Sequence, residues 1–208
     1  MFALVESGSI TKFLNGNQGI LIGDLKYSAD IFSNKWTESE RNAIGIYTVE
    51  TDLSNFKSIE WYTNTDLSYA YDSSSKKVKA TYGTATAKPH ADTTYTNTDK
   101  SNGEIPDGKD VGDVKTEGLK TIKKRQIDNQ CASLLAPSDW MVVKATETGE
   151  AMDSGWKTWR ASVRTKCNSM QTQIDNASDV DALAALFTYT KQGDGSYTRP
   201  LGEFPEKE

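Results

Sequence analysis

The feature that most constrains this 208-residue chain is a polar stretch, residues 85–115, with few large apolar side chains. Most of it is Thr, Asp, Asn, Gly and Lys. Such a segment by itself buries too little apolar surface to offset the conformational entropy lost on folding. We therefore expect a polar linker or an extended arm between two separately folded parts. Any order within it has to come from contacts outside the segment.

Residues 1–84 carry patterns with the two-residue period of β-strands. Phe2–Glu6 and Ser9–Phe13 flank a Ser7-Gly8 turn, which predicts a β-hairpin. In Lys77–Tyr82, apolar and polar residues alternate, as in a sheet with one face exposed to water. We therefore predict a small antiparallel β-rich domain in this part of the chain.

One short helix interrupts these strands. Thr37 and Glu40 have the spacing of a capping box, in which each side chain accepts a hydrogen bond from the backbone N–H of the other residue. Gly45 stands where a residue in the left-handed conformation ends a helix. The strand pattern resumes at Ile46.

Residues 116–190 carry the helical period instead. A first helix is predicted from near Thr116 and ends at Pro137, and the apolar run Trp140–Val143 is too short to assign to helix or strand. A second helix is predicted from near Asp153, because its apolar residues recur every three or four positions, as in a seam between helices. These residues are Trp156, Trp159, Val163, Cys167, Met170 and Ile174.

A third helix is predicted with Ser178 as its N-cap, and residues 191–208 are rich in Gly and polar side chains, which predicts a loose tail. The whole pattern predicts an α+β fold: a small antiparallel β-rich domain with one short helix, a polar linker, and a C-terminal helical hairpin or three-helix piece. Cys131 and Cys167 occupy apolar helical positions, so we expect buried, reduced thiols.

Charge and hydropathy argue against two classes of partner. The net charge is −5 and the sequence pI is about 5.1, whereas nucleic-acid binding needs a clustered basic face. No apolar run approaches the roughly 18 residues that span a membrane. The N-terminal sequence MFALVESGSITKF has no basic segment followed by a long apolar one, so no secretory signal is predicted. We expect neither nucleic acid nor membrane as a partner.

The residues that carry most enzymatic chemistry are scarce. His90 is the one histidine and has no Cys or second His nearby, so neither a metal site nor a His-based catalytic triad is predicted. The acids of Asp107–Asp113 lack the spacing of a calcium loop, and no glycine-rich phosphate loop occurs. Pairs such as Asp179/Asp181 are explained by helix capping. We therefore expect no catalytic residues, no cofactor and no enzymatic activity.

Two further groups of side chains have structural interpretations. The cluster Lys120, Lys123, Lys124 and Arg125 is typical of a solvated helix face, with acids nearby. The Tyr- and Trp-rich strands of residues 60–82 include Trp61 and Tyr69, which favour strand packing but also allow a carbohydrate-binding surface.

A resemblance appears in the stretch Leu134 to Arg164. Its residues are similar, in order and spacing, to a segment of the tail assembly chaperone and tail-fibre assembly proteins of tailed bacteriophages, which reads L-L-x-x-S/T-D-W, a short spacer, and W-x-x-Y-R-x-x-L-R. Trp159 and Val163 stand where Tyr and Leu are usual. The element from Trp36 to Ile46 also resembles the front of phage tail-associated proteins. The residues that carry the main resemblance are Leu134, Leu135, Ala136, Ser138, Asp139, Trp140, Glu147, Gly149, Trp156, Trp159, Arg160, Val163 and Arg164.

The resemblance implies a protein of the phage tail that acts by protein–protein contact, either as a tail-fibre assembly chaperone or as a structural adaptor in the virion. Its partners would be other tail or fibre proteins, with self-association left open, and it would reside in the virion tail or in the host cytoplasm during assembly. The alternative is a carbohydrate-binding, receptor-recognition module of a phage tail. The residues expected to bind the partner are Trp140, Trp156, Trp159, Arg160, Val163 and Arg164.

Overall fold

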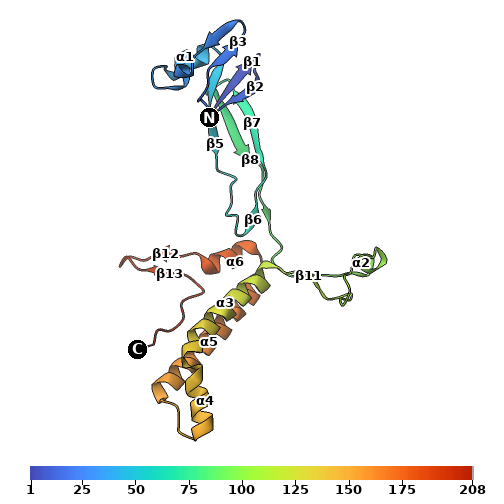
Figure 1. Cartoon of the computed structure of the whole chain (residues 1–208), viewed down its shortest axis with the longest axis vertical. Helices are drawn as coiled ribbons and strands as arrows, with labels where there is room; N and C mark the ends of the chain where they lie inside the picture. The colour runs from blue at the N-terminus through green and yellow to red at the C-terminus, as the bar shows by residue number, and fades with distance from the viewer. Residues whose placement is uncertain (208) are drawn as a thin grey trace. The chain divides into compact units, whose positions relative to one another are not determined.

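The computed structural model describes residues 1–207 and has the α+β class that the sequence predicts (Figure 1). The chain divides into two compact units, the first from Met1 to Thr86 and the second from Ala87 onward. The first unit is built on a five-stranded sheet, and the second contains the long helices.

The sheet of the first unit has the strand order β2-β1-β5-β8-β7. Its first hairpin turns at Ser7 and Gly8, which both have positive φ, 51° and 79°, as a tight two-residue hairpin turn requires. The other hairpin joins β7 and β8. The strands are β1 (Phe2–Glu6), β2 (Ser9–Leu14), β5 (Ile46–Asp52), β7 (Leu67–Asp72) and β8 (Lys77–Tyr82).

The sheet is mixed, which corrects the prediction of a purely antiparallel domain. β5 and β8 pair in parallel, with Val49 opposite Val78 and Asp52 opposite Thr81. Parallel neighbours need a long connection. Here the chain between β5 and β8 supplies it and contributes β7 on the way, at the edge of the sheet.

Both faces of the sheet contribute to a core. One face packs Leu4 and Ile46 against the segment that follows β2, where Ile31 is 2% exposed. The opposite face buries Val5 and Val78. The segment over the first face holds β3 (Ile20–Ile22), β4 (Leu25–Tyr27), a 3-10 turn η1 (Ala29–Phe32) and α1 (Glu38–Ala43).

The predicted capping box at the start of α1 is confirmed. The Thr37 side chain accepts from the Glu40 N–H at 3.2 Å, and Glu40 accepts from the Thr37 N–H at 2.7 Å. Gly45 ends the element with a φ of 81°, and a Cβ there would lie 2.9 Å from the Val5 carbonyl oxygen. Both the conformation and the close approach require glycine. Between β5 and β7 in the sequence, β6 (Tyr62–Thr63) pairs with β9 (Thr86–Ala87), where the first unit ends.

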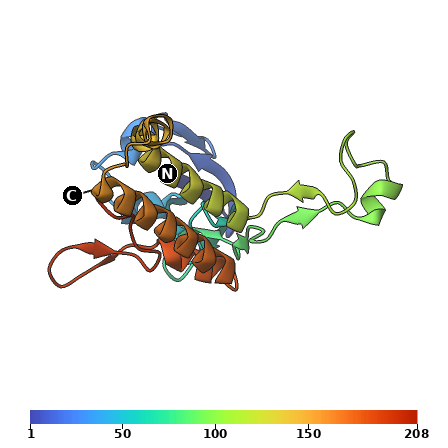
Figure 2. The ribbon, with the colours of Figure 1, turned by 90° about the horizontal axis from the view of Figure 1, so that it is seen from below.

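In the second unit, α3 (Leu119–Leu135) and α5 (Ser154–Asn176) lie side by side (Figures 1 and 2). The seam predicted for α5 is confirmed along four of its positions, and α3 and α6 (Val180–Phe187) complete the core. Its buried apolar residues are Leu119, Ile127, Cys131, Val163, Cys167, Met170, Ile174, Ala177, Val180, Leu183 and Leu201.

The polar stretch forms an ordered arm that projects from the start of α3 (Figure 2). Its strands β10 (Thr93–Thr94) and β11 (Val114–Thr116) are paired, and between them α2 (Asn97–Ser101) has a capping box of Thr96 and Asp99. The Asp99 carboxylate pairs with Lys115 and also accepts a hydrogen bond from Thr96. Together these two contacts hold the pKa of the Asp99 carboxyl below its ordinary range.

One residue outside α3 caps its N-terminus. Asp92 accepts from the Gly118 N–H at 2.7 Å and from the Thr121 hydroxyl at 2.9 Å. These two bonds lower the pKa of the Asp92 carboxyl. A Cβ on Gly118 would lie 2.3 Å from the Ala91 carbonyl carbon, so only glycine permits this approach. The base of the arm is therefore fixed to the helical unit.

Two details of the helical part differ from the sequence prediction. The predicted end of the first helix at Pro137 is confirmed, since α3 ends at Leu135 and Pro137 lies in the 3-10 turn η2 (Ala136–Ser138) that follows. A further helix, α4 (Asp139–Thr148), comes directly after this turn, so residues 117–207 contain four α-helices instead of the predicted three. Lys123, predicted on a solvated face, is 5% exposed and lies over the Phe187 ring.

Residues 191–207 are ordered, in contrast to the predicted loose tail. β12 (Thr190–Lys191) and β13 (Tyr197–Thr198) pair as a hairpin. Leu201 beyond it is fully buried, and its carbonyl oxygen accepts from Lys166 at 2.8 Å. The buried leucine and its hydrogen bonds fix the segment on α5.

Candidate functional site

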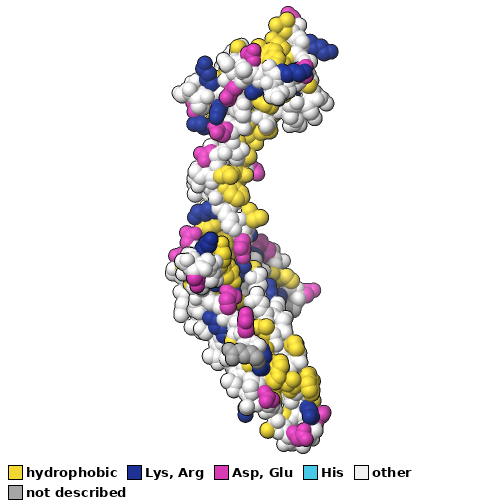
Figure 3. Space-filling view, turned by 90° about the vertical axis from the view of Figure 1, so that its left-hand side faces the viewer, with side chains coloured by type: hydrophobic (Ala, Val, Ile, Leu, Met, Phe, Trp, Pro, Cys, Tyr) yellow, Lys and Arg dark blue, Asp and Glu magenta, His cyan; other side chains and the backbone are white. Residues whose placement is uncertain are grey.

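The candidate site is the elbow formed by α4, the loop of residues 149–153 and the first turns of α5. All ten residues of α4 are described, and none of them is buried. Trp140 is 59% exposed, Val142 43% and Val143 55%. Figure 3 shows one of several groups of hydrophobic side chains at the lower end of the picture, where Figure 1 places α4. A short helix with so much apolar surface in water is typical of an interaction site.

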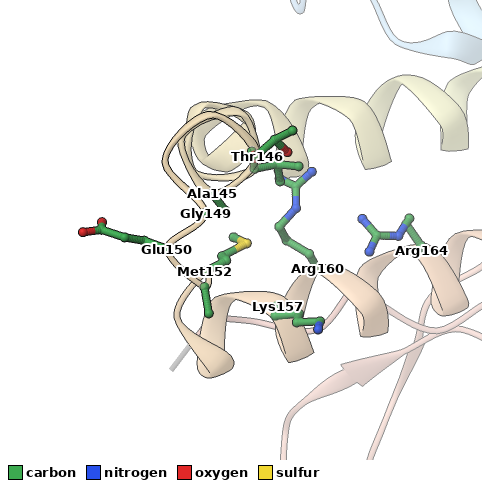
Figure 4. A pocket seen from close by; sticks show the side chains of 10 residues that line it. Ala145, Thr146, Gly149, Glu150, Met152, Lys157, Arg160 and Arg164 are labelled. Atoms are coloured by element: carbon green, nitrogen blue, oxygen red, sulfur yellow. Dashed lines mark hydrogen bonds between the residues drawn. The ribbon is translucent and has the colours of Figure 1, made fainter.

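Two hollows lie beside the elbow loop and share Ala145, Glu150, Ala151 and Met152 in their linings. The first, of about 490 Å³, is bounded by Val142 on α4 and by α5. The second, of about 480 Å³, lies beside Trp140. Figure 4 shows the first hollow, which we call the elbow groove. Its lining comprises Val142, Ala145, Thr146, Gly149, Glu150, Ala151, Met152, Lys157, Arg160 and Arg164.

Arg160 holds the elbow together. Its guanidinium donates to the Leu135 carbonyl oxygen at 2.7 Å and to the Ser138 hydroxyl at 2.5 Å, and it pairs with Asp139 at 2.6 Å. The Arg160 side chain is 9% exposed and that of Asp139 is 61% exposed. Three acceptors thus satisfy a nearly buried charge, as burial requires.

These contacts join the two ends of the stretch Leu134 to Arg164. The Ser-Asp pair before Trp140 and the arginine after Trp159 lie far apart in sequence, yet Ser138, Asp139 and Arg160 form one hydrogen-bonded cluster. Hydrogen bonds to a charged group contribute roughly 1.5–3 kcal/mol each, less where the partner is solvated, as Asp139 is. This part of the motif positions α4 on α5.

The predicted partner-binding residues therefore divide into two groups. Val163 is fully buried and Arg160 is bound internally, so neither is available to a partner in this structure. Trp159 is half-buried and its indole N–H donates to the Pro205 carbonyl oxygen at 3.0 Å. Trp156 contacts Trp159 edge to face, with ring centroids 5.5 Å apart. Among the six predicted residues, Trp140 and Arg164 are exposed.

The elbow groove carries two free cations. Within residues 1–207, the side chains of Lys157 and Arg164 make no hydrogen bond or ion pair. Glu150 is the one carboxylate in the lining, and it pairs with Lys144 at 3.2 Å and points away from the groove in Figure 4. The groove therefore combines an apolar floor with uncompensated positive charge.

Three groups of side chains that the sequence analysis weighed for chemistry have defined surroundings in the structure. Burial and the neighbouring Cys131 raise the pKa of the Cys167 thiol to about 12, which suppresses the thiolate form. No group of His, Cys, Asp and Glu in residues 1–207 could hold a metal ion. Two cations of the Lys120–Arg125 cluster make ion pairs within the chain: Lys124 pairs with Asp175 at 2.8 Å, and Arg125 pairs with Glu117 at 2.6 Å.

The surface considered for carbohydrate binding is also partly used by packing. Trp61 is 7% exposed, and Tyr69 is 38% exposed but packs at a tilt against Phe13, with ring centroids 4.6 Å apart. Sugars bind on exposed aromatic faces, and these two residues do not provide a shared one.

Comparison with known proteins returned no matching family, curated protein or solved structure. Across residues 1–207, no helix is both long and apolar enough to cross a membrane.

Sequence reasoning did not single out Val142, Val143 and Lys157. The signal was present in the run Trp140–Val143, since four consecutive apolar residues cover every side of a helix. In a helix that packs on one side only, such a run leaves apolar surface in water.

Proposed function

We propose that this chain is a bacteriophage tail or tail-fibre associated protein that acts by protein–protein contact through the exposed apolar side of α4. The observation that carries the proposal is that no residue of α4 is buried although it includes Trp140, Val142 and Val143. Aromatic residues of this kind dominate binding energy at protein interfaces. The resemblance of residues 134–164 to tail assembly proteins supplies the kind of partner.

The two roles that this function allows, assembly chaperone and structural adaptor, differ in whether the protein is present in the finished virion. A tail-fibre assembly chaperone leaves once the fibre is complete, whereas a structural adaptor stays in the virion. The hydrogen bonds of Arg160 to Leu135 and Asp139 hold the start of α4 on α5, which supports either version because Trp140 is then presented at a fixed place.

The test is co-expression of the tagged chain with tail and fibre proteins from a tailed phage, followed by affinity purification. We expect a tail or fibre protein to co-purify, and the yield to fall at least about tenfold in Trp140→Ala/Val143→Ala, because an interfacial anchor contributes about 2 kcal/mol or more. Tyr197→Ala is the matched control, since Tyr197 is 61% exposed but lies on β13.

Retention of the partner by the double variant, or loss of it with Tyr197→Ala alone, would contradict the role of α4. Fibre that is equally soluble and correctly assembled without this chain would exclude the chaperone version. Mass spectrometry of purified virions then distinguishes the adaptor, for which abundant copies are expected in the particle.

A further inference from the structure

The elbow groove and the polar arm are complementary in charge and in apolar character. The groove offers Val142 and Met152 beside two unpaired cations, Lys157 and Arg164. An acidic segment that also exposes apolar side chains would match both features.

The distal loop of the arm is such a segment. Residues 104–113 hold four carboxylates, on Glu104, Asp107, Asp110 and Asp113, against one ammonium, on Lys109. Val111 is 39% exposed and Val114, just beyond, is 42% exposed.

Little within the arm neutralises these acids. The Asp110 side chain is 88% exposed, and its one ion pair, with Lys100, has an N–O separation of 3.9 Å. Asp107 makes no ion pair among residues 1–207. Lys115 pairs with Asp99 and, at an N–O separation of 3.6 Å, with Glu104, so the acids with little compensation are Asp107, Asp110 and Asp113. The loop therefore presents net negative charge and two valines to solvent.

The arm and the groove lie at opposite ends of α3. The arm leaves the unit just before Leu119, and α4 begins just after Leu135. Seventeen helical residues span roughly 25 Å at 1.5 Å per residue, and the arm projects away from the helices (Figure 2). The acidic loop therefore cannot enter the groove of its own chain.

We propose that the elbow groove is a docking site for a second copy of this chain, whose loop of residues 104–114 occupies it. Val111 and Val114 of one copy pack against Val142 and Met152 of the next, and the loop carboxylates pair with Lys157 and Arg164. The contact is head-to-tail, so it repeats from copy to copy and generates a ring or an open row.

This contact is independent of the proposed phage function. The groove lies on the Val142 side of the elbow, whereas the surface around Trp140 belongs to the second hollow. A copy seated in the groove leaves Trp140 accessible to a tail or fibre protein.

The test is sedimentation velocity of the purified full-length chain over a concentration series, with no other protein present. We expect species larger than the monomer that become more abundant with concentration. Because exposed ion pairs are screened, association should weaken several-fold when the ionic strength is raised from about 0.05 M to about 0.5 M.

Charge reversal then identifies the two surfaces. The groove variant Lys157→Glu/Arg164→Glu and the arm variant Asp107→Lys/Asp110→Lys should each remain monomeric, because loop and groove then carry like charges. An equimolar mixture of the two variants should associate, since every loop then finds a groove of opposite charge. Lys12→Glu/Lys26→Glu is the control for net charge, because both lysines are exposed residues of the first unit.

Three results would overturn the proposal: a wild-type chain that stays monomeric at all concentrations, variants that associate as the wild type does, and a mixture that stays monomeric. Loss of association in the Lys12/Lys26 control would also overturn it, by showing that net charge alone governs association. None of these results bears on co-purification with tail or fibre proteins, so the two proposals fail separately.

Discussion

Helices α4 and α5 are neighbours in sequence but differ in how they use their apolar residues. α5 buries Val163, Cys167, Met170 and Ile174 along one side. α4 has four large apolar residues, Trp140–Val143, in its first turns and buries none of them. Helix α5 therefore acts as a scaffold, whereas α4 leaves its apolar residues in water.

Helix α5 supplies buried scaffold residues, and Trp140 at the start of α4 presents a surface. Arg160 is hydrogen-bonded within the chain and Val163 is buried, whereas Trp140 is exposed to solvent. Substitutions in α5 should therefore change stability, whereas substitutions in α4 should change binding and leave stability nearly unaltered.

The largest expected effect is on the seam of α5. Met170→Ala should lower the free energy of unfolding of the second unit by about 2–5 kcal/mol, because Met170 is fully buried and its truncation leaves a cavity. Val143→Ala on α4 should change it by no more than about 0.5 kcal/mol. Urea unfolding followed by helical circular dichroism measures both. Equal destabilisation by the two substitutions would remove the distinction between the helices.

The next effect concerns the junction of the two helices. Arg160→Met should lower the free energy of unfolding by about 1–3 kcal/mol, since it leaves the buried Ser138 hydroxyl and the Leu135 carbonyl oxygen without a charged donor. Arg164→Met is the matched control and should be nearly neutral. Thermal unfolding of the two variants provides the comparison, and an equal loss in both would show that Arg160 does not anchor α4.

A smaller effect is expected where residues 201–207 lie on α5. Trp159→Phe removes the hydrogen bond to Pro205 but keeps an aromatic ring, so the segment should loosen by about 0.5–1.5 kcal/mol. Trp156→Phe is the control, because the Trp156 indole N–H makes no hydrogen bond within residues 1–207. Limited proteolysis near residue 203 should accelerate in the first variant only. Equal cleavage rates would show that the Pro205 contact contributes nothing.

The smallest effect is the acid sensitivity of the arm. The pKa of the Asp99 carboxyl is lowered, first by Lys115 and then by Thr96. A lowered carboxyl pKa in the folded state stabilises the arm fully above the ordinary value of 3.8, and this stabilisation declines as the pH falls toward the lowered pKa. An acid titration followed by NMR should show the backbone amides of Thr96 and Lys115 losing their native chemical shifts at the lowest pH values. Asp99→Asn should lose the pH dependence, and an unchanged titration in that variant would contradict the assignment.

Elements with a local signal could be predicted from the sequence. The Ser7-Gly8 turn, the Thr37 capping box and the seam of α5 each depend on residues a few positions apart, and the structure has all three. The choice of Ser178 as the N-cap of α6 was one residue early, because Asp179 accepts from the Ala182 N–H.

Elements that depend on distant partners could not be predicted. The parallel pairing of β5 with β8, the capping of α3 by Asp92 and the anchoring of Leu201 join residues separated by tens of positions. The same holds for Arg160, whose acceptors lie more than twenty residues earlier in the chain. A sequence pattern shows that such a side chain is polar or apolar but not which group it will meet.

The most direct test of the division between α4 and α5 is hydrogen–deuterium exchange of the full chain, alone and with a co-purifying tail or fibre protein. A ten-residue helix with no buried residue is marginal by itself, so residues 139–148 should exchange much faster than residues 160–174 in the free chain. In the complex, residues 139–148 should become protected while residues 160–174 change little. Protection of α4 equal to that of α5 in the free chain, or no gain of protection in the complex, would contradict this account.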